Sequence, residues 1–167
     1  PADSGAFLWH LERAEPPVKL HDPDGAIACA AVSGNGRLLA TCAANGAIHV
    51  RTLDPMGTVR TIVASDPKDE FPIIPMSAAF SHDGLQLAVG YEDGSIVIYS
   101  TEGPNAGRRF LGHTKPVRGL EIAADGRRLL SVSNDGTIRV WDTGIARTVV
   151  TLRPRGMGTP TALFTPD

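Results

Sequence analysis

Apolar and polar residues alternate along most of this sequence with a period of two. Ile96 and Ile98 lie on one side of a predicted strand, and Ile138 and Val140 repeat the arrangement further along. This alternation gives one buried and one exposed face, which is typical of a β-strand. No stretch keeps the helical period over about twelve residues without glycine or proline. The pattern therefore predicts an all-β fold without a long helix.

Glycine turns divide these strands into a repeating unit. The first-turn glycines, Gly36, Gly84 and Gly126, are separated by 48 and 42 residues, and a second glycine follows each of them ten residues later. Glycine accepts the positive φ that a tight antiparallel turn requires. Three segments with the order strand, turn, strand, turn, strand span 31–54, 79–103 and 122–144.

With a fourth strand after each segment, the repeat becomes a unit of four antiparallel strands, lettered a to d along the chain. The first full unit has predicted strands at 26–33, 37–43, 47–52 and 58–64. The second has them at 75–81, 85–90, 95–100 and 107–111. The third has them at 117–123, 128–133, 137–142 and 147–152. Parts of further units are predicted as strands c and d at 6–11 and 17–21, and as strand a at 160–165.

The last full unit contains two dipeptides that are typical of one protein family. It contains Gly112-His113 before strand a and Trp141-Asp142 at the end of strand c, with Asp135-Gly136 at the turn between strands b and c. Together with a period near 42 residues, this closely resembles a WD repeat. The resemblance implies a β-propeller of four-stranded antiparallel blades, present here as a partial propeller of about four blades.

The resemblance also implies how the chain is divided. The whole of 1–167 is expected to be a single partial propeller domain. Residues 1–21 would end blade one, and residues 153–167 would begin blade five. The full units between them are blade two (22–64), blade three (65–111) and blade four (112–152).

A buried hydrogen-bonded group is a further implication of the resemblance. In the family, the His of Gly-His, a hydroxyl of strand b, the turn Asp and the Trp form this group. In blade four these residues are His113, Ser131, Asp135 and Trp141. A buried indole, imidazole and carboxylate each need a polar partner, and a closed network supplies them.

The other two full blades depart from this pattern. Blade two has Thr41, Asn45 and Arg51 at the Ser, Asp and Trp positions, and blade three has Val89 and Tyr99 at the Ser and Trp positions. These blades are expected to depend more on apolar packing.

Composition and charge exclude several functional classes. Hydrophobic residues make up 42% of the chain, which indicates a globular protein. The 16 basic and 18 acidic residues leave a net charge of −2, so no basic field favours nucleic acid or an anionic membrane as a partner. The two cysteines, Cys29 and Cys42, are expected to be core thiols in a reducing compartment, and the cytoplasm is the expected location.

No residue pattern points to catalysis, a metal or a cofactor. His113, Ser131 and Asp135 resemble a hydrolase triad in composition, but the structural network accounts for the same residues. His10, His21, His49 and His82 are scattered without a common ligand spacing, so no metal site is expected. No glycine-rich phosphate loop leads from a strand into a helix, and no cofactor is expected.

Binding residues are expected on the top face, which the d–a connections and b–c turns form. In the family, recognition often uses residues just before strand a and the residue before the turn Asp. These residues are Ile73, Ile74, Glu92, Lys115 and Asn134. The connection around 65–75 accounts for the six-residue excess of the longer repeat spacing, and its acidic residues favour a basic partner.

Two functional classes remain open from the sequence. The first is a non-catalytic scaffold that binds a protein or peptide. The second is a regulatory or structural propeller within a larger bacterial-type signalling enzyme, such as an ATPase, kinase or peptidase. The chain is either a stretch of a longer protein or a short chain that closes or assembles with copies of itself. An open arc exposes apolar blade faces, so self-association through these edges is expected.

Overall fold

The computed structural model describes residues 6–9, 16–63, 73–103, 107–154 and 161–165. Within these residues it is an all-β structure with no helix, as the alternation predicts. The strands are β1 (Ala6–Leu8), β2 (Val18–Leu20), β3 (Ile27–Val32), β4 (Leu38–Ala43), β5 (Ala47–Leu53), β6 (Met56–Val63), β7 (Pro75–Phe80), β8 (Gln86–Tyr91), β9 (Ile96–Ser100), β10 (Gly107–Phe110), β11 (Val117–Ile122), β12 (Arg128–Ser133), β13 (Ile138–Asp142) and β14 (Arg147–Leu152).

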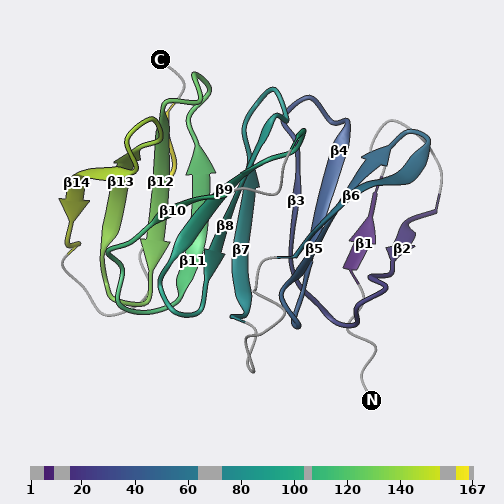
Figure 1. Ribbon diagram of the computed structural model, residues 1–167, viewed down its shortest axis with the longest axis horizontal. Helices are drawn as coiled ribbons and strands as arrows, with labels where there is room; N and C mark the ends of the chain where they lie inside the picture. Colours follow the sequence, from purple (N-terminus) through teal and green to yellow (C-terminus); the bar gives the residue numbers. More distant parts are fainter. Residues whose placement is uncertain (1–5, 10–15, 64–72, 104–106, 155–160, 166–167) are drawn as a thin grey trace.

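The strands form antiparallel sheets in chain order. Three sheets have four strands each, β3–β6, β7–β10 and β11–β14, and β1 pairs with β2 in a smaller sheet. Figure 1 shows the sheets side by side as a row of blades, with blade four at one end and β1–β2 at the other. The prediction of four-stranded antiparallel propeller blades is therefore confirmed.

Turn glycines hold the predicted backbone conformation. In blade four, Gly126 joins β11 to β12 with a φ of 70°, and Gly136 joins β12 to β13 with a φ of 79°. L-residues with a Cβ rarely adopt these angles, so glycine sets where each strand reverses. The equivalent glycines of blades two and three also have positive φ.

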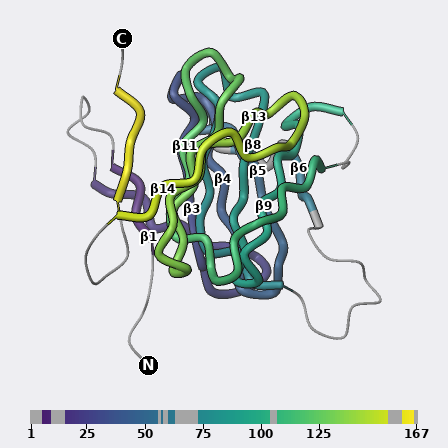
Figure 2. Tube along the Cα trace, turned by 90° about the vertical axis from the view of Figure 1, so that its left-hand side faces the viewer, coloured from purple at the N-terminus to yellow at the C-terminus, as the bar shows by residue number. Residues whose placement is uncertain are grey.

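The hydrophobic core lies between neighbouring blades. Each blade contacts the next through its innermost strand: β7 of blade three contacts β3 of blade two on one side and β11 of blade four on the other. Figure 2 views this row from the blade-four end, where the successive sheets overlap. One buried cluster joins blades two and three through residues such as Ile48, Val50 and Leu87. A second joins blades three and four through Phe110, Val117 and Trp141, among others.

One predicted strand is wrong in this structure. Residues 160–165 were expected to form strand a of blade five, but the described residues 161–165 are not in a strand. A strand needs a hydrogen-bonded neighbour, and no described strand pairs with this segment. It instead lies against blade four, where Ala162 and Phe164 pack on the cluster of Leu130, Val132 and Ile138.

Candidate functional site

Blade four contains a closed chain of buried hydrogen bonds. His113 precedes β11, Ser131 lies on β12, Asp135 follows β12, and Trp141 lies on β13. The His113 Nδ1 atom is 2.8 Å from the Asp135 carboxylate, and its Nε2 atom is 2.8 Å from Ser131 Oγ. The Trp141 indole N–H donates to the same Ser131 oxygen over 2.7 Å. The structure thus brings together all four residues that the resemblance implies.

Only one arrangement of protons satisfies every member of this chain. In that arrangement Ser131 Oγ accepts from the indole, the Ser131 hydroxyl donates to His113 Nε2, and His113 Nδ1–H donates to Asp135. The imidazole is therefore neutral. Burial lowers the pKa of His113 despite the neighbouring Asp135 carboxylate, which agrees with this assignment.

Asp135 remains ionised at the end of the chain. Burial alone would raise its pKa, but hydrogen bonds from Thr137 and His113 outweigh burial and hold the pKa well below its usual range. The Thr137 hydroxyl donates to Asp135 over 2.6 Å. Ser131 is fully buried, so its hydroxyl cannot reach a substrate carbonyl, and the triad interpretation of these residues has no geometric support.

Trp141 also joins blade four to blade three. Its indole meets Phe110 of β10 edge to face, with ring centroids 5.9 Å apart. The Arg139 guanidinium lies 5.7 Å from the Trp141 ring centroid. The indole therefore belongs both to the polar network and to the apolar contact between two blades.

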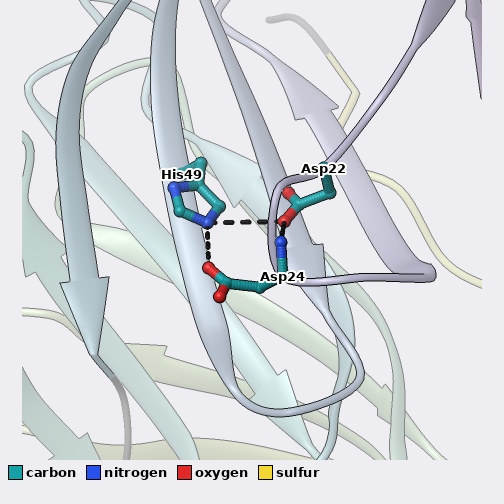
Figure 3. Close-up of side chains that lie close together, drawn as sticks. All are labelled: Asp22, Asp24 and His49. Atoms are coloured by element: carbon teal, nitrogen blue, oxygen red, sulfur yellow. Dashed lines mark hydrogen bonds and ion pairs between the residues drawn. The ribbon is translucent and has the colours of Figure 1, made fainter.

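Blade two has a polar cluster that the sequence reading missed. Figure 3 shows Asp22 and Asp24, from the turn before β3, facing His49 of β5. The His49 Nε2 atom is 2.6 Å from Asp24 Oδ2 and 3.4 Å from Asp22 Oδ1. The His49 Nδ1 atom is 3.1 Å from the Thr61 hydroxyl on β6.

This cluster occupies the place of the blade-four network, with a carboxylate and a guanidinium where blade four has an imidazole and an indole. The fully buried Asp22 carboxylate accepts a 2.6 Å hydrogen bond from the hydroxyl of Thr41. In blade four, the hydroxyl at the equivalent position, that of Ser131, contacts the His113 imidazole instead. Arg51, at the position of Trp141, lies 3.9 Å from Asp22 and donates to the His21 carbonyl. Blade two was expected to depend more on apolar packing than blade four, and it has this polar cluster in addition to its apolar core. Only folding brings the turn at 22–24 to β5, so sequence spacing could not reveal the cluster.

The same cluster has the donor atoms that a metal ion would use. One ligand atom each from Asp22, Asp24 and His49 lies within 4.8 Å of the others. The Asp24–His49 hydrogen bond and the Thr41–Asp22 hydrogen bond already partner these groups within the protein. Hydrogen bonds and ion pairs account for the arrangement without a metal.

Blade three uses two tyrosines in place of the network. The hydroxyl groups of Tyr91 and Tyr99 form a 2.8 Å hydrogen bond to each other. Burial is the main reason that the pKa values of both phenols are raised, so both remain neutral. Val89, at the serine position, is fully buried in the cluster that joins blades two and three.

The predicted binding positions share one backbone feature in all three full blades. The amide that follows strand b donates to the carbonyl just before strand a. In blade three, Glu92 N–H donates to Ile74 over 3.0 Å, and in blade four Asn134 N–H donates to Pro116 over 3.0 Å. In blade two, Ala44 N–H donates to Ala26 over 3.1 Å. This bond holds the two predicted contact positions of each blade side by side.

The side chains at these positions differ in exposure. Glu92, Lys115 and Asn134 are exposed, whereas Ile73 and Ile74 are half-buried. Ile73 packs against the core cluster between blades two and three, so Ile74 is the better candidate for an exposed apolar contact. Most of the 65–75 connection, including residues 65–72, lies outside the described residues.

The positions of blades three and four adjoin each other. Gly94, in the turn that also contains Glu92, packs so closely that an added Cβ would lie 2.6 Å from the His113 carbonyl oxygen and 3.1 Å from that of Lys115. In Figure 1 the β11 and β12 arrows point in opposite directions, so the segment before β11 and the turn after β12 lie at the same edge. The predicted residues therefore form one continuous edge, named here the blade three–four edge: Ile74, Glu92, Lys115 and Asn134.

Comparisons with known proteins agree with the blade architecture. The sequence profile described as "WD domain, G-beta repeat" matches residues 15–51, 69–100 and 106–142. The chain therefore belongs to the WD-repeat family, as the Gly-His and Trp-Asp pairs imply.

Three similar proteins have different names. WD repeat-containing protein SL1-17 of Schistosoma mansoni is 33% identical over 89% of this chain and 47% of its own length. Nuclear distribution protein PAC1 of Arthroderma benhamiae is 31% identical over 83% of this chain and 31% of its own length. The U3 small nucleolar RNA-associated protein 15 homolog of Xenopus tropicalis is 41% identical over 38% of this chain and 12% of its own length. The chain spans less than half the length of each of these relatives.

Proposed function

We propose that this chain is a non-catalytic, cytoplasmic WD-repeat scaffold that binds a protein or peptide at the blade three–four edge. One observation carries the proposal: a half-buried apolar side chain, Ile74, is held by a backbone hydrogen bond beside the exposed Glu92. An apolar contact with a polar rim is typical of a protein interface. Blade two has only Ala26 and Ala44 at the equivalent positions.

The charges at this edge favour a partner with a basic residue next to an apolar one. Glu92 and Asp93 are both exposed, and Asp93 pairs with Arg109 over 3.0 Å. Among the residues that the structure describes, that leaves Glu92 as the acidic group beside Ile74, while Lys115 supplies a positive charge further along the edge. Acidic groups repel phosphate, so a protein partner is favoured over nucleic acid. The name of one relative associates that protein with a small nucleolar RNA, and a nucleic-acid arm in the experiment below addresses this point.

The test uses peptides selected from a random library against the folded chain. Selected peptides should combine a Lys or Arg with an apolar anchor, and binding is measured by calorimetry. Ile74→Asp should weaken binding by about 1–3 kcal/mol, because a charged group replaces the apolar contact. Single-stranded RNA of mixed sequence is titrated in parallel and should bind far more weakly.

Ile145→Asp is the matched control. Ile145 is 66% exposed and lies in the β13–β14 turn, which is at the opposite edge of the blade from the β12–β13 turn. It should not change peptide affinity. Peptides that bind Ile74→Asp as tightly as the unchanged chain would remove the binding site from this edge.

A second function, as a regulatory segment of a larger signalling enzyme, has its own support. A relative named NACHT domain- and WD repeat-containing protein 1, from Mus musculus, is 31% identical over half of this chain and only 5% of its own length. Such repeats therefore occur in long chains whose names include another domain. The activity of a full-length protein, compared with and without the propeller, distinguishes this function from that of a scaffold.

A further inference from the structure

The two cysteines of the chain are direct neighbours across a pair of inner strands. Cys29 on β3 is paired with Cys42 on β4 in the antiparallel register, and both thiols are free. Residues opposite each other in such a pair have Cα atoms about 4.5–5.5 Å apart. A disulfide usually joins Cα atoms about 4.4–6.8 Å apart, so the backbone already has a suitable separation.

The side chains also meet on the same face of the sheet. Directly opposed residues of an antiparallel pair project from the same side of the sheet, and Cys29 and Cys42 are such a pair. Cys42 is fully buried in the cluster between blades two and three, and Cys29 is half-buried against that cluster. Cys29 is therefore the thiol that an oxidant from solvent reaches first, and Cys42 is the thiol that can react with the oxidised Cys29.

We propose that Cys29 and Cys42 form a redox-sensitive pair that a peroxide converts into a cross-strand disulfide. The sulfur of Cys29 attacks one oxygen of hydrogen peroxide and becomes a sulfenic acid. The O–O bond breaks, and the departing oxygen leaves as water with the thiol proton. The sulfur of Cys42 then displaces the sulfenic hydroxyl group, which leaves as a second water with the Cys42 proton. Two thiols and one peroxide thus give one disulfide and two water molecules.

This link would tie together the strands that carry the blade-two cluster. β3 follows the turn that contains Asp22 and Asp24, and β4 carries Thr41 directly before Cys42. β3 also packs against β7 of blade three. A covalent bond between β3 and β4 restricts the unfolded chain, so the oxidised protein should unfold at a higher urea concentration than the reduced protein.

The second step should be slow at neutral pH. The neighbouring Cys29 thiol and burial raise the pKa of the Cys42 thiol well above its ordinary value. A thiol reacts through its thiolate, so disulfide formation should accelerate as the pH rises toward the pKa of Cys42.

The experiment treats the reduced, folded full chain with hydrogen peroxide, then denatures it and alkylates the remaining thiols. Intact mass should show the loss of two hydrogen atoms and no alkyl groups. Peptide mapping should recover the segments of Cys29 and Cys42 joined, and the urea midpoint should rise. Disulfide-linked dimers, sulfinic acid on Cys29 with free Cys42, or two unreacted thiols would each overturn the proposal. A linked protein with an unchanged urea midpoint would overturn its stabilising effect.

A moved thiol provides the matched control. In the double variant Cys29→Ala, Ala31→Cys, the new thiol lies opposite Ala40 and diagonal to Cys42. Diagonal neighbours in an antiparallel pair are about 7–8 Å apart, beyond the usual span of a disulfide. This variant keeps the cysteine count and should not form the internal bond. If it links as readily as the unchanged chain, the opposed register is not what makes the pair reactive.

Discussion

At the scale of single residues, blade four assigns each proton of its buried group. The Trp141 indole can only donate, and the Asp135 carboxylate only accepts. Every hydrogen between them has a partner when Ser131 donates to His113 and His113 donates to Asp135. Each polar atom in this chain has a partner, which removes the cost of burying it. The hydrogen-bonded network also connects β12 and β13 to the segment that precedes β11.

Trp141→Ala should lower the free energy of unfolding by about 3 kcal/mol or more. The change leaves a cavity beside Phe110 and removes the donor to Ser131. Urea titration measures the difference, with Trp9→Ala as the control because Trp9 is 66% exposed. The control should change stability by about 0.5 kcal/mol or less. A loss below about 1 kcal/mol for Trp141→Ala would show that the network is not a main source of stability.

Acid should weaken the fold through His113 before it acts through Asp135. The pKa of His113 is lowered in the folded state, so the unfolded chain binds a proton more readily below its ordinary pKa of about 6.5. The stabilisation from neutral His113 is present above that pH and is lost as the pH falls. Asp135 follows the same sign at lower pH, because its folded pKa lies below the ordinary value of about 3.9.

Urea titrations at pH 7.5 and 5.5 check this expectation, with His113→Gln as the comparison. The unchanged chain should lose stability between these pH values, and the variant should lose less. Equal pH dependence in both proteins would place the sensitive group elsewhere.

At the scale of elements, close approach between inner strands joins the blades. A Cβ added to Gly90 on β8 would lie 2.7 Å from Ser77 Oγ of the same blade and 2.7 Å from Val117 Cγ1 of blade four. Ser77 in turn donates a 2.9 Å hydrogen bond to the Val117 carbonyl, which crosses from blade three to blade four. A small residue at position 90 is therefore a requirement of blade packing rather than of a turn.

Gly90→Ala should destabilise the chain by about 1–3 kcal/mol, because buried neighbours must move to admit the methyl group. Gly119→Ala is the control within a strand of the next blade. Its added Cβ would lie 3.6 Å from the nearest side-chain atom, in Val132, which is an ordinary contact. Thermal unfolding measures the midpoint temperature of both variants. Equal midpoints would mean that the neighbours of Gly90 can move apart to admit the methyl group at little cost.

At the scale of the whole molecule, the polar features are unevenly distributed along the row of blades. Blades three and four place charged or polar groups at the edge that contains Ile74, whereas blade two presents alanines there. At one end of the row, β14 exposes Val149, Val150 and Leu152 by 41–50%. Exposed apolar surface of this kind is the feature on which the sequence-based expectation of self-association through blade edges depends.

Glu92→Lys should mainly slow the association of a basic peptide and reduce the salt dependence of its association rate. Glu92 is an exposed charge at the rim, where it attracts the peptide before contact more than it holds the bound complex. Stopped-flow binding at low and high salt measures both effects. Glu102→Lys, an equal charge change at an exposed position just after β9, is the control. If the two variants behave alike, only net charge attracts the peptide.

The sequence by itself determined the blade architecture and one of its buried networks. Alternating residues and turn glycines are local signals, and a repeat period shows how local units are arranged along the chain. The Gly-His and Trp-Asp pairs could likewise be mapped onto His113 and Trp141, because blade four keeps the spacing of its family. The strand predicted at 160–165 failed because local pattern does not supply a pairing partner.

Tertiary structure alone decided the features that depend on distant segments. It set Asp22 against Thr41 and Arg51, where the family pattern would place an imidazole against a hydroxyl and an indole. It also set Cys29 opposite Cys42, and packed the half-buried Ile73 against the core cluster while leaving Ile74 at the edge. Register and inter-blade packing arise from contacts far apart in the chain, and a pattern of neighbouring residues carries no information about such distances.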